Sequence, residues 1–370
     1  MRVLLAPDKF KGTLTAAEVV EHLAAGIRSR RPDVEIASAP VADGGDGMLD
    51  AFERAGFSRV TVKAAGPTGD VGATSYVRRG DEAVVELAAV AGLAKLGEDL
   101  APMTATSRGV GEVIVAALDA GCTHIVLGIG GSASTDGGAG MAQALGARVL
   151  DADGNDVGNG GGPLADVASL DLSTLHPGLA DARIEVASDV DNPLTGDRGA
   201  AAVYGPQKGA DDDQVRSLDG ALARWADVVA DATGHDHRDD PGAGAAGGVG
   251  FGAVAVLGAS LRPGVDLVLD LIDFPSHLSG ADLVVTGEGS LDEQTLNGKA
   301  PVGVARAARS AGVPVVAVAG RCALDENQLH DAGFEAAYML LDEASSRDEA
   351  FERPAPLLER IGAQLAERLT

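Results

Sequence analysis

The chain opens with the stretch RVLLAPDKFKGTLTAAE, residues 2–18, which decides the fold class. RVLLAP (2–7) is a short apolar run that predicts a buried strand. TAAE (15–18) matches the capping box, in which a threonine and a glutamate three residues later satisfy free N–H groups at a helix start. Apolar residues then recur at the spacing of an amphipathic helix: Val20, Leu23, Ala24 and Ile27. The chain therefore starts as strand, loop and helix.

The same order returns further along the chain. EIASAPV (35–41) predicts a second strand, and the glycine-rich DGGDG (43–47) opens a helix with the apolar residues Met48, Leu49 and Phe52. Near the C-terminus, strands are predicted at 282–289, 313–320 and 335–341, and helices at 299–309 and 357–369. Strands that alternate with helices are typical of a parallel α/β sheet.

The middle of the chain is less regular. ATSYVRR (73–79) and EAVVELA (82–88) indicate a hairpin. A regular pattern at both ends with an irregular centre indicates a discontinuous domain. We predict one parallel-sheet domain from residues 1–65 and 276–370, with residues 66–275 inserted as a mixed α/β domain.

Charge and composition exclude several classes of protein. Lys plus Arg number 29 and Asp plus Glu 55, which gives a formal charge of −26. A chain this acidic lacks the basic face that nucleic acids require. No apolar run approaches the ~20 residues of a membrane-spanning helix, so no membrane partner is expected. The two cysteines, Cys122 and Cys322, cannot build a disulfide framework, so we expect a cytoplasmic location.

Glycine makes up 51 of the 370 residues and occurs in clusters. The longest, GIGGSASTDGGAG (128–140), follows the predicted strand HIVLGIG (124–130). A loop rich in backbone N–H groups at a strand end suits phosphate groups. The candidate substrate- and phosphate-binding residues in this loop are Gly130, Gly131, Ser132 and Asp136.

The same loop supports an alternative interpretation. Gly128, Gly130 and Ala133 match the G-x-G-x-x-A turn of dinucleotide-binding folds, and Asp151 and Asp153 follow at about the right distance. The alternative is an NAD-dependent hydroxyacid oxidoreductase. The further glycines at 137, 138 and 140 would interrupt the first turns of the helix that this motif requires.

Carboxylates and lysines follow several other predicted strands. Asp189 and Asp191 are one strand period apart at the end of RIEVASD (183–189), so both can emerge on one side. The other candidates are Asp43, Asp46, Glu288 and Asp292 among the acids, and Lys11 and Lys299 among the lysines. Acids suit Mg²⁺ and an ammonium suits phosphate. Phosphoryl transfer uses this combination, because its transition state needs positioning and charge neutralisation more than covalent chemistry.

Six motifs follow one another along the chain: APDKFKGTL, ADGGDG, GIGGSASTDGGAGMAQALGA, SDVDNPLTGDRGAAAVYGPQKGA, GAGAAGGVGFG and TGEGSLDEQTLNGKAP. In this order they resemble the motifs of type-1 glycerate kinases, the glycerate 2-kinase family. The resemblance implies transfer of the γ-phosphoryl group of ATP, with Mg²⁺, to the 2-hydroxyl of glycerate. It also implies two α/β domains, one flavodoxin-like and one inserted, with the active site in the cleft between them.

Three positions depart from the family pattern. Lys9 stands where the family usually has serine, which leaves Lys11 as the better phosphate contact. Asp46 stands where glutamate is usual, and Ala243 where glycine is common. None of these changes alters the reaction class that the resemblance implies.

Together these features give a hypothesis for the mechanism. ATP phosphates bind over a glycine-rich loop, and one carboxylate takes the proton from the glycerate hydroxyl. Lys11 and Lys299 neutralise the transferred phosphoryl group, and Asp189 and Asp191 are candidates for the base and for the Mg²⁺ ligands. Arg321 is a candidate for binding the carboxylate of glycerate. A nucleotide-binding regulatory module without turnover is a third interpretation, and a homo-oligomer is possible.

Overall fold

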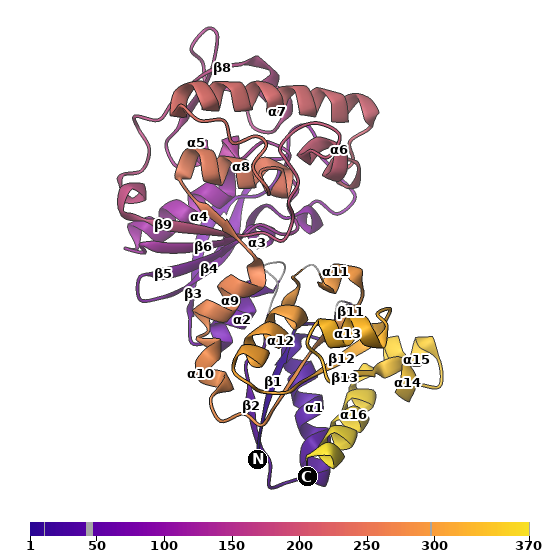
Figure 1. Ribbon diagram of the computed structural model, residues 1–370. Helices are drawn as coiled ribbons and strands as arrows, with labels where there is room; N and C mark the ends of the chain where they lie inside the picture. Colours follow the sequence, from indigo (N-terminus) through magenta and orange to yellow (C-terminus); the bar gives the residue numbers. More distant parts are fainter. Residues whose placement is uncertain (11, 42–46, 297, 370) are drawn as a thin grey trace. The chain divides into compact units, whose positions relative to one another are not determined.

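The first strand and helix form where the opening stretch predicts them. The computed structural model describes residues 1–10, 12–41, 47–296 and 298–369 (Figure 1). Strand β1 (Arg2–Pro7) leads to helix α1 (Ala16–Arg30), and the predicted capping box is complete. The predicted apolar face of the helix is confirmed except at one position, because Val19 is buried and Val20 is only half-buried.

The chain divides into two compact units. The first unit is residues 1–43 with 263–370, and the second unit is residues 44–262. The chain therefore passes from one unit to the other at 43/44 and at 262/263. Both boundaries come earlier in the chain than those expected from the sequence, 65/66 and 275/276. The first does so because β3 (Ser58–Ala65) pairs with β4 (Val71–Arg79) in the sheet of the second unit. The second does so because α9 (Gly264–Leu271) packs against α12 (Ala300–Ser310) in the first unit.

The sheet of the first unit is entirely parallel. Its strands lie in the order β13-β12-β11-β1-β2, so the chain adds β2 on one side of β1 and the later strands on the other. This is the 2-1-3-4-5 order of flavodoxin-like folds, as expected. After α1 the elements of this unit are β2 (Glu35–Ser38), α9, α10 (Phe274–Leu278), β11 (Leu283–Leu291), α11 (Glu293–Leu296), α12 (Ala300–Ser310), β12 (Val315–Cys322), α13 (Glu326–Asp331), β13 (Ala336–Met339), α14 (Leu340–Glu343), α15 (Arg347–Glu352) and α16 (Pro354–Arg368).

Helices cover both faces of this parallel sheet. α1 and α16 lie side by side on one face, and α12 packs against the other (Figure 1). The two helices approach closely because each has a glycine where they meet. A Cβ on Gly26 would lie 2.1 Å from the carbonyl oxygen of Glu359, and one on Gly362 would lie 2.4 Å from that of Leu23. This close packing holds the strands and their carboxyl ends in place.

The second unit is built on a mixed sheet with the strand order β10-β9-β6-β5-β4-β3. The first four strands are parallel, and β4 pairs antiparallel with both β5 and β3, which confirms the predicted hairpin. The strands β7 and β8 form a separate antiparallel pair. Besides β3 and β4, the elements are α2 (Met48–Arg54), β5 (Glu82–Glu86), α3 (Leu87–Ala91), η1 (Leu93–Lys95), α4 (Arg108–Asp119), β6 (His124–Gly128), α5 (Ala139–Ala144), β7 (Arg148–Asp151), η2 (Gly162–Asp166), β8 (Val167–Asp171), η3 (Pro177–Asp181), β9 (Arg183–Ala187), α6 (Ala200–Tyr204), η4 (Pro206–Lys208), α7 (Asp212–Thr233), α8 (Ala245–Leu257) and β10 (Ser260–Arg262).

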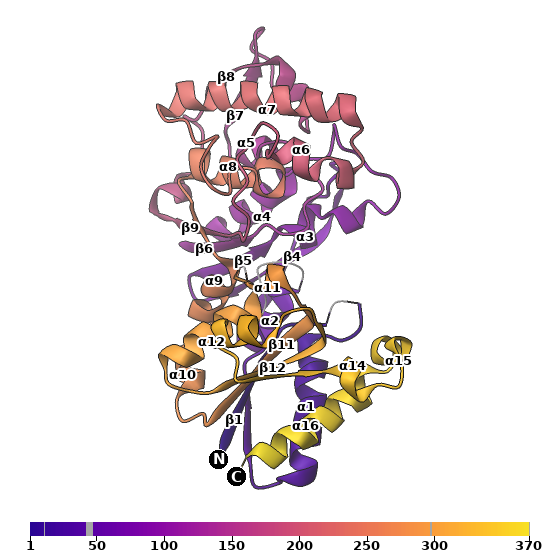
Figure 2. The same cartoon turned by 45° about the vertical axis from the view of Figure 1, so that its right-hand side comes forward.

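The glycine-rich loops of the second unit pack against each other. Helix α7, which lies beside α8 and β8 (Figure 2), carries the fully buried Trp225. The indole N–H of Trp225 donates a hydrogen bond to the carbonyl of Gly137, and the N–H of Gly137 donates to the carbonyl of Gly247, both at 3.0 Å. A Cβ on Gly247 would lie 2.0 Å from the carbonyl oxygen of Ser134. Much of the glycine clustering therefore serves backbone-to-backbone packing.

Replacing Gly137 with alanine is expected to destabilise the second unit strongly. Gly137 has a φ of +62°, and a Cβ there would lie 2.5 Å from Cδ1 of Trp225. Left-handed backbone costs alanine about 1–2 kcal/mol and overpacking adds about 1–3 kcal/mol. We expect urea denaturation to show the free energy of unfolding lowered by about 2–5 kcal/mol. In the control Gly234→Ala, φ is +81° and the space is open, so only the backbone cost applies. Equal losses in the two variants would contradict this packing argument.

Candidate active site

Charged side chains gather at the carboxyl ends of the strands in the first unit. They are Asp8, Lys9, Glu288, Asp292 and Arg321. The parallel register places Pro7 of β1 beside Gly287 of β11, and the N–H of Asp8 donates to the carbonyl of Gly287 at 2.8 Å. In flavodoxin-like sheets ligands bind where the strand order reverses, which here is between β1 and β11. The topology therefore makes the region beside Asp8 and Glu288 a candidate ligand site.

Glu288 is held by neighbours from the segment that follows its strand. Thr295 Oγ1 donates a hydrogen bond to Glu288 Oε1 at 2.5 Å, and Lys299 Nζ lies 3.8 Å from Glu288 Oε2. The fully buried Thr295 also accepts a hydrogen bond from the N–H of Asp292 at 3.0 Å. A hydroxyl donor and a nearby ammonium both favour a negative charge on the carboxylate. Sequence reasoning selected Glu288, Asp292 and Lys299 but missed Thr295, which orients the carboxylate of Glu288.

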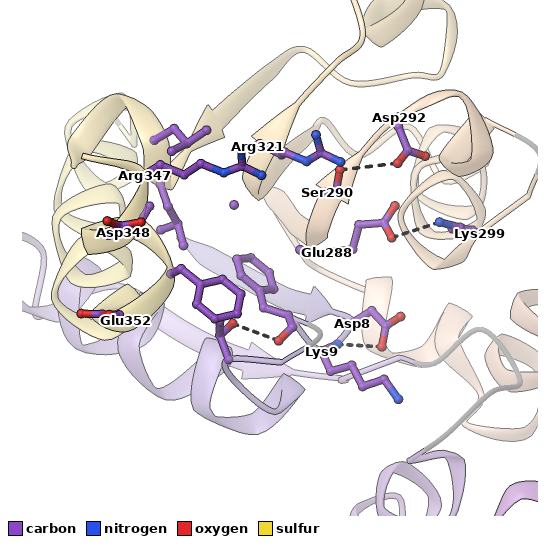
Figure 3. A pocket seen from close by; sticks show the side chains of 18 residues that line it. Asp8, Lys9, Glu288, Ser290, Asp292, Lys299, Arg321, Arg347, Asp348 and Glu352 are labelled. Carbon is purple, nitrogen blue, oxygen red and sulfur yellow. Dashed lines mark hydrogen bonds and ion pairs between the residues drawn. The ribbon is translucent and has the colours of Figure 1, made fainter. Parts of the chain in front are cut away.

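Glu288, Asp292 and Lys299 line a cavity of about 450 Å³ in the first unit (Figure 3). The volume falls within the ~300–1,000 Å³ of typical small-molecule sites. Its charged lining residues include Asp8, Lys9, Glu288, Asp292, Lys299, Arg321, Arg347, Asp348 and Glu352, and its large apolar ones are Phe10, Leu340, Leu341 and Phe351. In Figure 3 the side chain of Arg347 extends toward Arg321, and the guanidinium of Arg321 lies beside Ser290. The cavity thus combines cations, carboxylates and an apolar surface.

Three predicted site residues, Lys11, Asp43 and Asp46, lie outside the described residues, and their roles stay predictions. Helix α2, which follows the DGGDG segment, begins where predicted. Its first turn is capped by the buried Glu86, whose carboxylate accepts hydrogen bonds from the N–H groups of Gly47 at 3.2 Å and Leu49 at 3.0 Å. Sequence reasoning missed this contact, and the only signal for it was an acid within the apolar run at 82–88.

The predicted phosphate loop after β6 is mostly buried. Gly131 is exposed and Gly130 is half-buried, whereas Ser132 is 7% exposed and Asp136 is completely buried. The Asp136 carboxylate accepts hydrogen bonds from the N–H and the hydroxyl of Ser107, at 2.8 and 2.9 Å. The role of Asp136 in substrate binding therefore stays a prediction, and the structure shows it in an internal contact. Asp136 ties the loop to the start of α4, because its carboxylate is enclosed by the protein.

Lys208, which sequence reasoning missed, supports the same loop from inside. Its side chain is 2% exposed, and Nζ donates hydrogen bonds to Ser132 Oγ at 2.9 Å and to the carbonyl of Ser134. Burial lowers the pKa of Lys208 to about 7, and the negative charge of Asp136 opposes this shift. A buried lysine is rare unless it is paired. Lys208 therefore places a titratable cation next to Ser132, whose neighbours Gly130 and Gly131 reach the surface.

Asp189 and Asp191 do not lie on a strand. β9 ends at Ala187, so the alternation of strand side chains does not set their direction. The Asp191 side chain is 79% exposed and forms an ion pair with Arg198 at 3.2 Å. Within the described ranges, no three His, Cys, Asp or Glu side chains converge as a metal site. The roles of Asp189 and Asp191 as base or Mg²⁺ ligands stay predictions.

A family model for the glycerate kinase family matches residues 3–370 of this chain. The chain belongs to the glycerate kinase family. It is 44% identical to the glycerate kinase of Bacillus subtilis (strain 168), over 99% of this chain and 97% of that protein. It is 43% identical to the glycerate 2-kinase of Escherichia coli (strain K12), over 95% and 93% of the two chains. A crystal structure assigned provisionally to glycerate kinase 2 of Salmonella typhimurium LT2 superposes with a TM-score of 0.88, at 41% identity over 100% and 98% of the two chains.

Membership of the glycerate kinase family confirms the predicted enzyme class, an ATP-dependent kinase of glycerate. The alternative of an NAD-dependent oxidoreductase is not supported. After Ala133 the chain does not enter a helix, because Gly137 and Gly138 adopt φ values of +62° and +72°, and α5 begins only at Ala139. The loop thus lacks the helix N-terminus that holds the pyrophosphate in dinucleotide folds. Among the described helices, none is long and apolar enough to span a bilayer.

Proposed function

We propose that this glycerate kinase transfers the γ-phosphoryl group of ATP to the 2-hydroxyl of glycerate, which yields 2-phosphoglycerate and ADP. The hydroxyl proton passes to a carboxylate, the hydroxyl oxygen forms a bond to the γ-phosphorus, and the bond from that phosphorus to the ADP oxygen breaks. The observation that carries the proposal is Glu288, oriented by Thr295 and 3.8 Å from Lys299, in a cavity at the β1–β11 edge. The E. coli relative named glycerate 2-kinase supports the position of transfer.

The described residues suggest a division of roles. Glu288 is the preferred base, because it is 12% exposed and its orientation is set by hydrogen bonding, whereas Asp191 is 79% exposed. Lys299 and Arg321 line the cavity and would bind anionic groups of the substrates. Gly130, Gly131 and Ser132 are proposed to contribute backbone N–H groups to an anion, and Lys11 a further cation. Catalysis in the cleft between the domains, a cytoplasmic location and a homo-oligomeric state stay predictions.

Mg²⁺ is the metal that we propose to accompany ATP. It usually takes only one or two carboxylates from a protein and completes its shell with phosphate oxygens and water. The exposed carboxylates of Asp189 and Asp191 suit such a hard cation, and they remain the proposed ligands. When bound, Mg²⁺ would neutralise negative charge on the phosphates.

A coupled assay tests the function directly. The purified protein is incubated with Mg²⁺, D-glycerate and either ATP or NAD. We expect ADP release that depends on glycerate, and ³¹P–¹H NMR of the product should place the phosphate on the 2-oxygen. NADH formation without ADP would contradict the proposal. Tight ATP binding without turnover of any hydroxy acid would favour a regulatory module, and a 3-phosphate would correct the position of transfer.

A further inference from the structure

The cavity of the first unit has an apolar side that reaches solvent. Phe351 is 61% exposed and Leu341 is 37% exposed, although both are large apolar side chains. They line the same cavity as Phe10, which is 2% exposed and belongs to the core around α1 and α16. Apolar surface that continues from a core to the mouth of a cavity is typical of a binding site. The occupant therefore has an apolar part that can cover Phe351.

The same cavity has two arginines that pair with no acid in the part of the chain that the structure describes. Arg321 comes from β12 and Arg347 from α15, and in Figure 3 the side chain of Arg347 extends toward Arg321. Among the described residues, neither guanidinium forms an ion pair or a hydrogen bond. Free guanidinium groups suit phosphates, which they can bind through two parallel hydrogen bonds. The occupant therefore also has an anionic part.

We propose that this cavity is the nucleotide site, with the adenine base of ATP against Phe351 and Leu341 and its phosphates facing Arg321 and Arg347. The proposal rests on the proposed kinase function and assigns one of its two substrates to the first unit. Glycerate, a three-carbon acid, has no apolar part to cover Phe351 and would leave most of the 450 Å³ unfilled. A nucleotide supplies both a flat aromatic base and an anionic tail.

The assignment revises the role of Arg321 and adds Phe351, Leu341 and Arg347 to the site. Arg321, expected from the sequence to bind the carboxylate of glycerate, becomes a phosphate contact. Phe351 and Arg347 were not selected by sequence reasoning. The site lies at the β1–β11 edge, where the flavodoxin-like strand order reverses and where such sheets bind nucleotides. Lys299 and Glu288 line the same cavity, so the nucleotide would lie beside the proposed base.

Binding measurements on variants of the full-length protein separate the two parts of the site. Calorimetric titrations use three probes, the non-hydrolysable analogue AMP-PNP with Mg²⁺, adenosine and D-glycerate. Phe351→Ala should weaken binding of both AMP-PNP and adenosine by roughly 10-fold, because base stacking on an aromatic side chain is lost. Arg347→Ala should weaken AMP-PNP by roughly 10-fold and leave adenosine unchanged, because only phosphate contacts are lost. Neither variant should change the affinity for glycerate.

Control variants outside the cavity test whether these losses of affinity are specific, and certain results would contradict the nucleotide assignment. Val71→Ala and Arg28→Ala remove an exposed apolar residue and an exposed arginine that do not line this cavity, and both should bind all probes like the wild type. Phe351→Tyr keeps the ring and should retain AMP-PNP affinity. Unchanged AMP-PNP binding in Phe351→Ala, or weaker glycerate binding in either variant, would overturn the nucleotide assignment. Failure of the kinase function would instead appear as absent glycerate-dependent ADP release in the wild type, whatever the titrations show.

Discussion

Replacing Glu288 with glutamine is expected to lower kcat by ~10²–10⁴-fold, the usual effect of losing a general base. Glutamine has the same shape and its amide oxygen still accepts the hydrogen bond from Thr295, so the fold should be retained. The free energy of unfolding and the affinity for AMP-PNP should change little. Steady-state kinetics with saturating ATP and glycerate give the rate, and circular dichroism checks the fold.

Comparison with other carboxylates identifies the base. Glu293→Gln is the matched control, because Glu293 is exposed on the neighbouring α11 and does not line the cavity. It should keep the wild-type rate. Asp189→Asn and Asp191→Asn test the alternative base predicted from the sequence. A rate near the wild-type value in Glu288→Gln, together with a ~10²-fold or larger loss in either aspartate variant, would move the base to the loop after β9.

Lys208→Met is expected to lower both the stability and the activity of the protein. Methionine fills the space of the stem but removes two hydrogen bonds from the ammonium, to Ser132 Oγ and to the carbonyl of Ser134. Hydrogen bonds of a charged donor contribute about 1.5–3 kcal/mol each, and removal of a buried charge offsets part of the loss. We expect the free energy of unfolding to fall by about 2–4 kcal/mol in urea denaturation.

Lys95→Met is the control for this substitution, because Lys95 is exposed on η1. It should alter stability by less than about 0.5 kcal/mol. In Lys208→Met the activity should also fall below that of the control at a temperature where both proteins are folded, because the Gly130–Ser132 segment loses its internal support. Wild-type stability in Lys208→Met would show that the buried lysine does not hold the loop.

The titration of Lys208 gives a pH dependence with a definite sign. Burial lowers the pKa of this lysine to about 7 in the folded protein, whereas a lysine in an unfolded chain titrates near ~10.4. Between these values the unfolded chain binds a proton that the folded protein does not, so stability rises with pH across this window. The difference in free energy of unfolding between wild type and Lys208→Met should therefore grow from pH 7 to pH 9.5. A difference that shrinks or stays constant would contradict the lowered pKa.

Local structure and family membership followed from the sequence alone. The capping box at residues 15–18 and the strand at 2–7 depend on residues close together in the chain, so their pattern was enough to predict them. The order of six long motifs was enough to indicate a glycerate kinase, and the family match confirms it. The strand-end positions of Glu288 and Arg321 were also visible, because charged residues that follow an apolar run mark the end of a buried strand.

Only the tertiary structure decided which of these residues lie close together. Pro7 and Gly287 are neighbours through strand pairing, and this long-range register brings Asp8 to Glu288. The burial of Lys208 and Asp136 depends on helices and loops packed from elsewhere in the second unit, so a lysine and an aspartate that look like surface residues became internal supports. Sequence patterns report local backbone preference and periodic burial, whereas register, domain boundaries and the enclosure of a polar group are set by contacts between segments distant in the chain.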